Sequence, residues 1–128
     1  MAATDRVWMT NVEQVLTNVQ GNTYPIGPVW DVGDWSEMFV EIQTVLSDAE
    51  ADTEIKWYVE SAVATGVASL WEKCFPEANL PHTTSYRSVA RTNEGGLRRW
   101  ARVVLYQNGT TQRTVKVNVI ALLKKSAG

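Results

Sequence analysis

The sequence predicts an all-β protein, an antiparallel β-sandwich of the jelly-roll kind with an extended N-terminal segment. Its alternating apolar and polar runs would make about seven short strands, and turn signals separate these runs. The runs are also rich in β-branched and aromatic residues, which favour strands. With 128 residues, of which 45% are hydrophobic and 20% charged, the chain has the size and composition of one globular domain.

The N-terminal segment, residues 1–28, is interpreted either as an arm or as the first strand of the sandwich. Apolar residues between positions 12 and 19 have helical spacing, but the Val and Thr content suits a strand, which we favour. Pro25 and Pro28 fix φ and remove backbone donors, so the stretch around them is expected to be extended. An extended arm is suited to lie across a neighbouring protein or to add a strand to its sheet.

The sandwich itself is assigned to residues 29–125, followed by a short tail at 126–128. Two alternating runs, 38–46 and 55–61, flank a polar loop and either form an antiparallel hairpin or cross between two sheets. A further strand is predicted at 83–90, before a turn at 92–96.

The clearest predicted hairpin joins residues 97–106 to residues 111–123. Between them lies the sequence QNGT, and Asn-Gly favours a type I′ turn because both of its central residues need positive φ. In the final run, Val115, Val117 and Val119 alternate with polar or larger residues, as expected of a strand with one buried face.

Composition excludes several classes of chemistry. A single cysteine, Cys74, excludes an internal disulfide framework, and a single histidine, His82, excludes multi-histidine metal centres. Cys74 lies in an apolar run typical of a core thiol, and no activated nucleophile accompanies His82 in the sequence, so we expect no enzyme and no cofactor. No targeting segment is visible in residues 1–21, and no apolar stretch approaches the roughly 20 residues of a membrane span.

Two charged clusters have alternative interpretations. Asp48, Glu50 and Asp52 could ligate calcium, but the EF-hand pattern is absent and an acidic loop is the default. The basic residues around Trp100 could bind nucleic acid, or Arg102 could cover core surface or pair with a carboxylate on a neighbouring strand. Because the net charge is −2, we expect neither nucleic acid nor an anionic membrane as a partner.

The tryptophans are numerous for this length, and they lie at positions 8, 30, 35, 57, 71 and 100. Exposed tryptophans on a sandwich face could stack on sugars, which makes a carbohydrate-binding module one alternative function. Buried ones would be core residues, as we expect for Trp57, and others would be covered by neighbouring subunits.

Several short motifs follow one another along the chain. They are the entry GDW at 33–35 with the run that follows it, the strand end VES at 59–61, Trp71, and the strand motif RWAR at 99–102 before a Val-rich last strand. In this order the chain, from about residue 29 to 123, resembles small β-sandwich structural proteins of tailed bacteriophages and phage-like particles, of the capsid-decoration or minor-capsid kind. That family has no catalytic motif, so no functional residue is carried over.

The resemblance implies a structural virion protein, a capsid decoration or cement protein that binds the outer surface of a phage head and stabilises the shell. Its expected partner is the major capsid protein, and it is expected to form a homo-oligomer, a trimer being one allowed state. It would be assembled in the host cytoplasm and end on the capsid surface, and the alternative within the same class is a tail or neck component. The predicted partner-binding residues are Val12, Leu16, Tyr24, Pro25, Trp30 and Trp35.

Overall fold

The computed structural model describes residues 5–35, 37–46, 54–80, 84–90 and 97–124. These residues form nine strands and one short 3₁₀ helix. In chain order they are β1 (Asp5–Leu16), β2 (Thr23–Asp31), β3 (Glu37–Leu46), β4 (Ile55–Ala62), η1 (Ala68–Leu70), β5 (Glu72–Lys73), β6 (Ala78–Asn79), β7 (Thr84–Ala90), β8 (Trp100–Gln107) and β9 (Arg113–Lys124).

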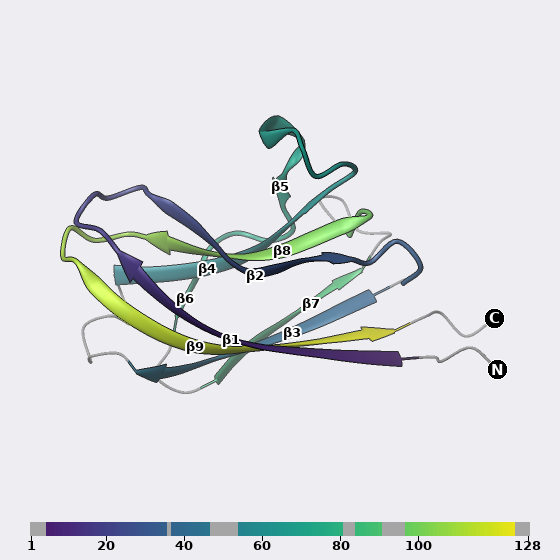
Figure 1. Cartoon of the computed structure of the whole chain (residues 1–128), viewed down its shortest axis with the longest axis horizontal. Coiled ribbons are helices and arrows are strands. Elements are labelled where there is room, and N and C mark those ends of the chain that lie inside the picture. Colours follow the sequence, from purple (N-terminus) through teal and green to yellow (C-terminus); the bar gives the residue numbers. More distant parts are fainter. Residues whose placement is uncertain (1–4, 36, 47–53, 81–83, 91–96, 125–128) are drawn as a thin grey trace.

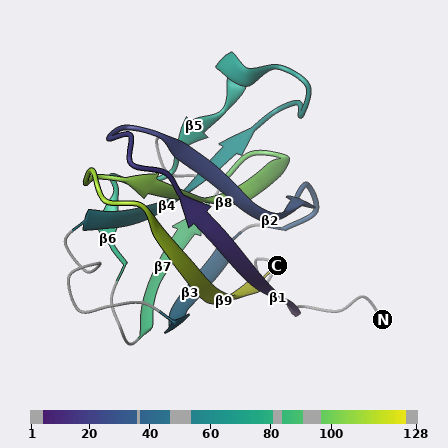
Figure 2. The same cartoon turned by 60° about the vertical axis from the view of Figure 1, so that its left-hand side comes forward.

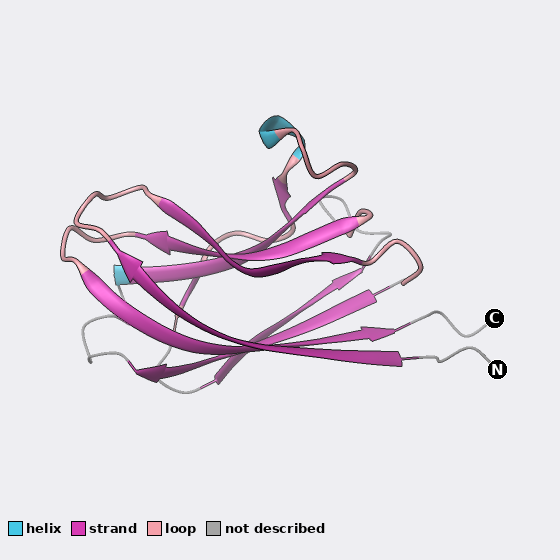
Figure 3. Cartoon of the chain, viewed as in Figure 1, coloured by secondary structure: helices cyan, strands magenta, loops and turns pink. Residues whose placement is uncertain are grey.

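The strands make two antiparallel sheets that pack face to face, as Figures 1 and 3 show. One sheet has the order β1-β9-β3-β7, and we call it the first sheet. The second sheet has the order β2-β8-β4-β5, and β6 also pairs with β4. The predicted antiparallel β-sandwich is therefore confirmed. The runs predicted at 38–46 and 55–61 lie in different sheets, so the chain crosses between the layers there rather than making a hairpin.

Pairing in the two sheets is nested. β1 pairs with β9, β2 with β8, β3 with β7 and β4 with β5, so early strands pair with late ones in order. The outermost pair is also long, because it runs in continuous register from Asp5 opposite Lys124 to Leu16 opposite Arg113. The path resembles one long hairpin that has been folded over into two layers.

Between the sheets lies a core built from the inward-facing residues of each strand. On β9 these are Val115, Val117, Val119, Ala121 and Leu123, each no more than 1% exposed. Trp57, on β4, is fully buried as expected, and its ring meets that of Phe75 edge to face at 5.3 Å between centroids.

The N-terminal segment supplies an edge strand to each sheet, because β1 pairs only with β9 and β2 only with β8 among the described strands. β2 is irregular: its register with β8 shifts between Ile26 and Trp30, where Gly27 has a φ of 69°. Pro25 is tolerated there because an edge strand leaves one row of backbone donors unpaired. The expected extended stretch is thus a bulged edge strand.

The hairpin predicted between residues 97–106 and 111–123 is wrong. β8 pairs with β2 and β4, whereas β9 pairs with β1 and β3, so the two strands lie in different sheets. No type I′ turn forms, because within the described ranges only Gly21 and Gly27 have positive φ. The Asn-Gly signal is local and contains no information on distant strands. Each of the two strands has two other partners because the chain crosses to the opposite layer between them.

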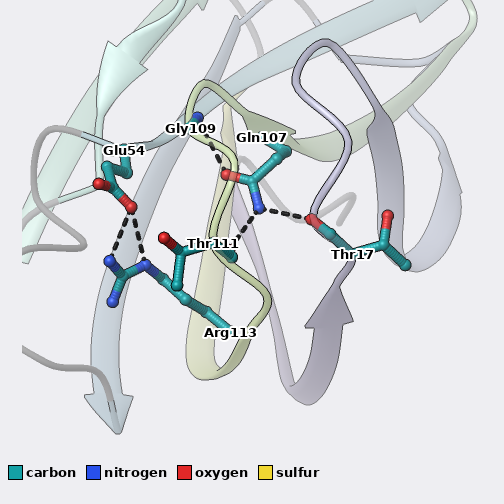
Figure 4. A network of polar contacts seen from close by, with 6 residues as sticks. All are labelled: Thr17, Glu54, Gln107, Gly109, Thr111 and Arg113. Atoms are coloured by element: carbon teal, nitrogen blue, oxygen red, sulfur yellow. Dashed lines mark hydrogen bonds and ion pairs between the residues drawn. The ribbon is translucent and has the colours of Figure 1, made fainter.

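That crossing is organised by the side chain of Gln107, which is fully buried (Figure 4). Its Nε2 donates to the carbonyl oxygens of Thr17 at 2.7 Å and Thr111 at 3.0 Å, and its Oε1 accepts from the N–H of Gly109 at 3.0 Å. One amide therefore fastens together the β1–β2 and β8–β9 connections, residues 17–22 and 108–112, which we call the crossover end.

An ion pair supports the same region. Both Nε and Nη2 of Arg113 donate to Oε2 of Glu54, at 3.1 and 2.7 Å, and only 7% of the Arg113 side chain is exposed (Figure 4). The N–H of Asn108 in turn donates to the carbonyl oxygen of Glu54 at 2.7 Å. The start of β4 is thereby tied to the crossover end.

Candidate interaction surface

One loop stands away from the body of the sandwich. It comprises residues 63–71 and is called here the projecting loop; Figures 1 and 2 show it, with η1 at its tip, beyond β5 on the side of the second sheet. Small residues and Gly66 follow the end of β4 and favour no regular strand. A single 3₁₀ turn then reverses the chain, with the N–H of Leu70 donating to the carbonyl oxygen of Val67 at 3.1 Å.

The projecting loop exposes large apolar side chains. Val63 is 60% exposed, Val67 47% and Leu70 36%, and no residue of η1 is buried. Among the residues whose side chains are described, the other exposed large hydrophobic residues are Val15, Val19 and Val29, spread over β1, β2 and their connection. Single exposed hydrophobics are ordinary, but a gathering of them on a protruding element is typical of an interaction site.

Beneath the projecting loop, a stack of charged and aromatic groups forms a base. Arg102 donates from Nε to Oε1 of Glu60 at 2.6 Å, and its guanidinium carbon lies 4.0 Å from the centroid of the Trp71 ring. The Arg102 and Glu60 side chains are only 24% and 12% exposed, so water screens their attraction weakly. Of the alternatives open for Arg102, the pair with a carboxylate on a neighbouring strand is therefore present, and that carboxylate is Glu60.

Further contacts hold the chain at the two ends of the projecting loop. The hydroxyl of Ser61 donates to the carbonyl oxygen of Trp100 at 2.6 Å and accepts from the N–H of Arg98 at 2.7 Å. Arg98 pairs with Glu72 at 2.9 Å, where the chain leaves the projecting loop. The loop therefore stands on braced backbone at both of its ends.

Lys73 completes the base on the β5 side. It pairs with Glu77, and its ammonium lies 4.9 Å from the centroid of the Tyr58 ring. The hydrogen bond from Lys73 is the largest of the effects that lower the pKa of Glu77. Burial, followed by the negative charges of Glu60 and Glu77, raises the pKa of Tyr58 to about 12. The phenol is neutral at physiological pH and acts as packing surface.

Cys74 has the character of a core thiol. Burial raises its pKa to about 12, so little reactive thiolate exists near neutral pH. Its N–H donates to the carbonyl oxygen of Val59 at 2.8 Å. His82 and the acidic residues at 48–52 lie outside the described residues, and the part of the chain that is described brings together no group of three or more His, Cys, Asp or Glu side chains that could hold a metal.

Two half-exposed tryptophans, Trp71 in the projecting loop and Trp100 on β8, each have an arginine against the ring. Trp71 carries Arg102 on its ring, and Arg99 lies 5.2 Å from the centroid of Trp100. Trp30 is 6% exposed, and Trp35 packs against the core. Trp30, Trp35, Trp71 and Trp100 therefore do not present bare rings as one platform for stacking on sugars, and the side chain of Trp8 lies outside the described residues.

The residues predicted to bind a partner do not form one surface. Leu16 is fully buried and Trp30 nearly so, because both point into the core; this corrects their assignment as partner contacts. Val12, Tyr24 and Trp35 are partly buried against the core, and Pro25 is exposed on the edge of the second sheet. β1 and β2 belong to different sheets, which separates the set further.

Tyr24 instead serves the fold. Its hydroxyl oxygen accepts from the N–H of Thr17 at 2.9 Å and lies 2.8 Å from the Thr17 hydroxyl. The side-chain hydrogen bond with Thr17 is the largest cause that lowers the pKa of Tyr24. This contact helps to hold the β1–β2 connection.

Sequence reasoning missed the projecting loop. The stretch AVATGVASL is recognisable as small and Gly-interrupted, but periodicity does not reveal whether its aliphatic residues tuck under the sandwich or stand out from it. One feature of the sequence could have indicated an exposed apolar loop: Val63, Val67 and Leu70 lie in a segment that lacks the alternation of a strand.

No helix in the described residues is long and apolar enough to cross a membrane. No family model matches the chain, and no curated protein matches its sequence.

Solved structures whose backbones align with this chain include one of the pili formed by Bacillus endospore appendages. The sequence identity is 11% and the TM-score 0.45, and the alignment covers 98% of this chain and 96% of the other. A second is the K1 cleaved adhesin domain of Lys-gingipain from Porphyromonas gingivalis W83, at 9% identity and a TM-score of 0.47, covering 99% and 94%. A third is a family 11 carbohydrate-binding module from Clostridium thermocellum, at 11% identity and a TM-score of 0.44, covering 100% and 93%. At this level of similarity none of them assigns a ligand, a partner or an activity to the present chain.

Proposed function

We propose that this protein is a structural component of a virus-like particle, a capsid decoration or cement protein that attaches to the major capsid protein on the outer surface of a phage head. The observation that carries the proposal is the gathering of Val63, Val67 and Leu70 on a loop that stands out from a braced base. When a partner covers exposed apolar side chains, the binding free energy becomes more favourable by roughly 25 cal/mol per Å² of apolar surface removed from water. The projecting loop is the anchor in this proposal.

Two further features support it. The nested strand pairing favours the jelly-roll arrangement, which recurs in viral capsid and lectin domains. Around the foot of the projecting loop lie charged residues, among them Arg98, Glu72 and Lys73, which suits the polar rim of a protein interface around an apolar centre. Repetition over a shell would strengthen a modest contact through multivalency.

The proposal is tested by co-sedimentation of the purified protein with capsids from its source. We expect wild-type protein to bind in stoichiometric lattice numbers, and the double variant Val67→Asp with Leu70→Asp to lose binding by at least tenfold, because two carboxylates would be desolvated in the contact. Val19→Asp with Val29→Asp is the matched control, since these residues are at least comparably exposed, at 52% and 42%, and lie outside the projecting loop; it should bind like wild type.

Equal binding by both double variants would remove the projecting loop from the interface. Binding of wild-type protein to purified tails or necks and not to heads would move the protein to another virion component. Light scattering on the free protein measures the oligomeric state, for which we propose a homo-oligomer that matches a symmetry axis of the shell.

A further inference from the structure

The outer face of the first sheet carries a row of three carboxamides. On β9, Asn118 faces outward between the inward-facing Val117 and Val119. Its register partners are Asn11 on β1 and Gln43 on β3. Because neighbouring strands lie about 4.8 Å apart, the row crosses three strands and spans roughly 10 Å.

This row lines a hollow of about 370 Å³ on the sheet surface. Its lining residues are Thr10, Asn11, Gln43, Asn118, Val119 and Ile120. Asn11 and Gln43 are exposed and Asn118 is half-buried. None of the three carboxamides makes a side-chain hydrogen bond to any residue of the described chain, whereas the carboxamides of Gln20, Asn22 and Gln107 do.

The chemistry of the hollow favours a neutral, hydroxyl-rich ligand. Each carboxamide offers two N–H donors and an acceptor oxygen, which matches hydroxyl groups that both donate and accept. The lining contains no charged side chain, so it offers an ionic ligand no counter-charge. Ile120 supplies an apolar surface beside the amides, suited to the C–H faces of a sugar ring.

We propose that this hollow, called the amide row site, binds a neutral oligosaccharide laid across β1, β9 and β3. The site lies on the first sheet, whereas the projecting loop belongs to the second, so one can fail without the other. Sugar recognition here uses hydrogen-bonding amides and does not depend on the tryptophans, two of which are stacked on arginines.

The test observes the side-chain amide signals directly in ¹H–¹⁵N correlation spectra of the full chain. Maltohexaose, cellohexaose, mannohexaose and xylohexaose are titrated separately. We expect at least one of them to shift the side-chain NH₂ signals of Asn11, Gln43 and Asn118 in a saturable manner. Asn118→Leu should weaken that binding roughly tenfold, because it removes the central donors and acceptor of the row.

Asn18→Leu is the matched control, since Asn18 is an exposed amide in the β1–β2 connection and outside the hollow; it should bind like wild type. Unchanged spectra of both variants at backbone positions in the core verify that the fold is intact. Absence of saturable shifts with all four sugars overturns the proposal. So does a shift of the same three amides on raising the protein concentration without sugar, which would assign the face to self-association, or equal weakening by both variants.

Discussion

The crossover end and the projecting loop are two sets of connections that treat polar and apolar groups in opposite ways. At the crossover end a polar side chain, Gln107, is buried and every hydrogen bond it makes joins two parts of the fold. In the projecting loop, Val63, Val67 and Leu70 are held out in solvent. Burying an amide lowers the stability of the fold unless the amide is hydrogen-bonded, and aliphatic side chains that stay in water add no hydrophobic stabilisation to the folded monomer. The first region therefore serves folding, and the second is available to a partner.

The contrast between the two regions is tested most strongly by the substitution Gln107→Leu, for which the largest effect on stability is expected. The substitution keeps the volume but leaves the carbonyl oxygens of Thr17 and Thr111 and the N–H of Gly109 without their partner. We expect a loss of about 3 kcal/mol in the free energy of unfolding. Urea denaturation measures it, with Gln112→Leu, an exposed amide in the same connection, as the control. A loss of similar size in the control would show that the buried amide is not special.

A second substitution tests the base of the projecting loop. Arg102→Ala removes the ion pair with Glu60 and the stacking on Trp71, and it leaves the largely buried Glu60 carboxylate without this partner. We expect a loss of about 2 kcal/mol and faster proteolysis within residues 63–71. Arg99→Ala is the control, because Arg99 is 62% exposed and its pair with Asp31 lies in solvent, which screens it and leaves it little effect on stability. Equal losses in the two variants would contradict a structural role for the Arg102 stack.

Alkaline pH gives a third test, through the groups next to this base. The folded pKa of Cys74 is raised from 9.0 to about 12, and that of Tyr58 from 10.0 to about 12. Above pH 9 the unfolded chain holds fewer protons than the folded one, so stability that is complete below pH 9 is lost as the pH rises toward 12. Denaturation between pH 8 and 11 should show this decline, and Cys74→Ala should flatten it. An identical slope in the variant would assign the decline to other groups.

The smallest expected effect is that of Leu70→Ser, a polar replacement at an exposed loop position. Because Leu70 is 36% exposed and contributes to no buried cluster, the free energy of unfolding should change by less than about 0.5 kcal/mol. Thermal unfolding checks this. A larger loss would mean that the projecting loop packs on the sandwich, and it would weaken the contrast with Gln107.

Local rules predicted the strands well and their partners poorly. Alternation located the run at 38–46 and the run after Thr111, because each strand buries one face and exposes the other. The Asn-Gly sequence at 108–109 indicated a hairpin, but pairing depends on which distant strands flank β8 and β9, and a two-residue signal carries no information on that. Local propensity and global topology disagree at this one connection.

The candidate site was harder to foresee than the fold. Leu16 was predicted on a partner surface as part of a candidate arm, and Trp30 lies just beyond that segment, yet a segment that pairs in a sheet also buries alternate side chains. The alternation of its strand made a pair between Arg102 and a neighbouring carboxylate one of the alternatives, and the structure contains that pair. The exposure of Val67 and the row formed by Asn11, Asn118 and Gln43 depend on tertiary register, which no local pattern specifies.

The nested pairing also governs when the protein can fold. β9, which is synthesised after the other described strands, is the interior strand that joins β1 to β3 in the first sheet. Until it is synthesised, β1 has no partner in the described sheets, and the apolar face that it shares with β3 cannot close. Such long-range closure is slow and leaves edges unpaired in the nascent chain. The first sheet is therefore expected to close only after β9 has been synthesised, and removal of β9 should yield an insoluble chain rather than a smaller sandwich.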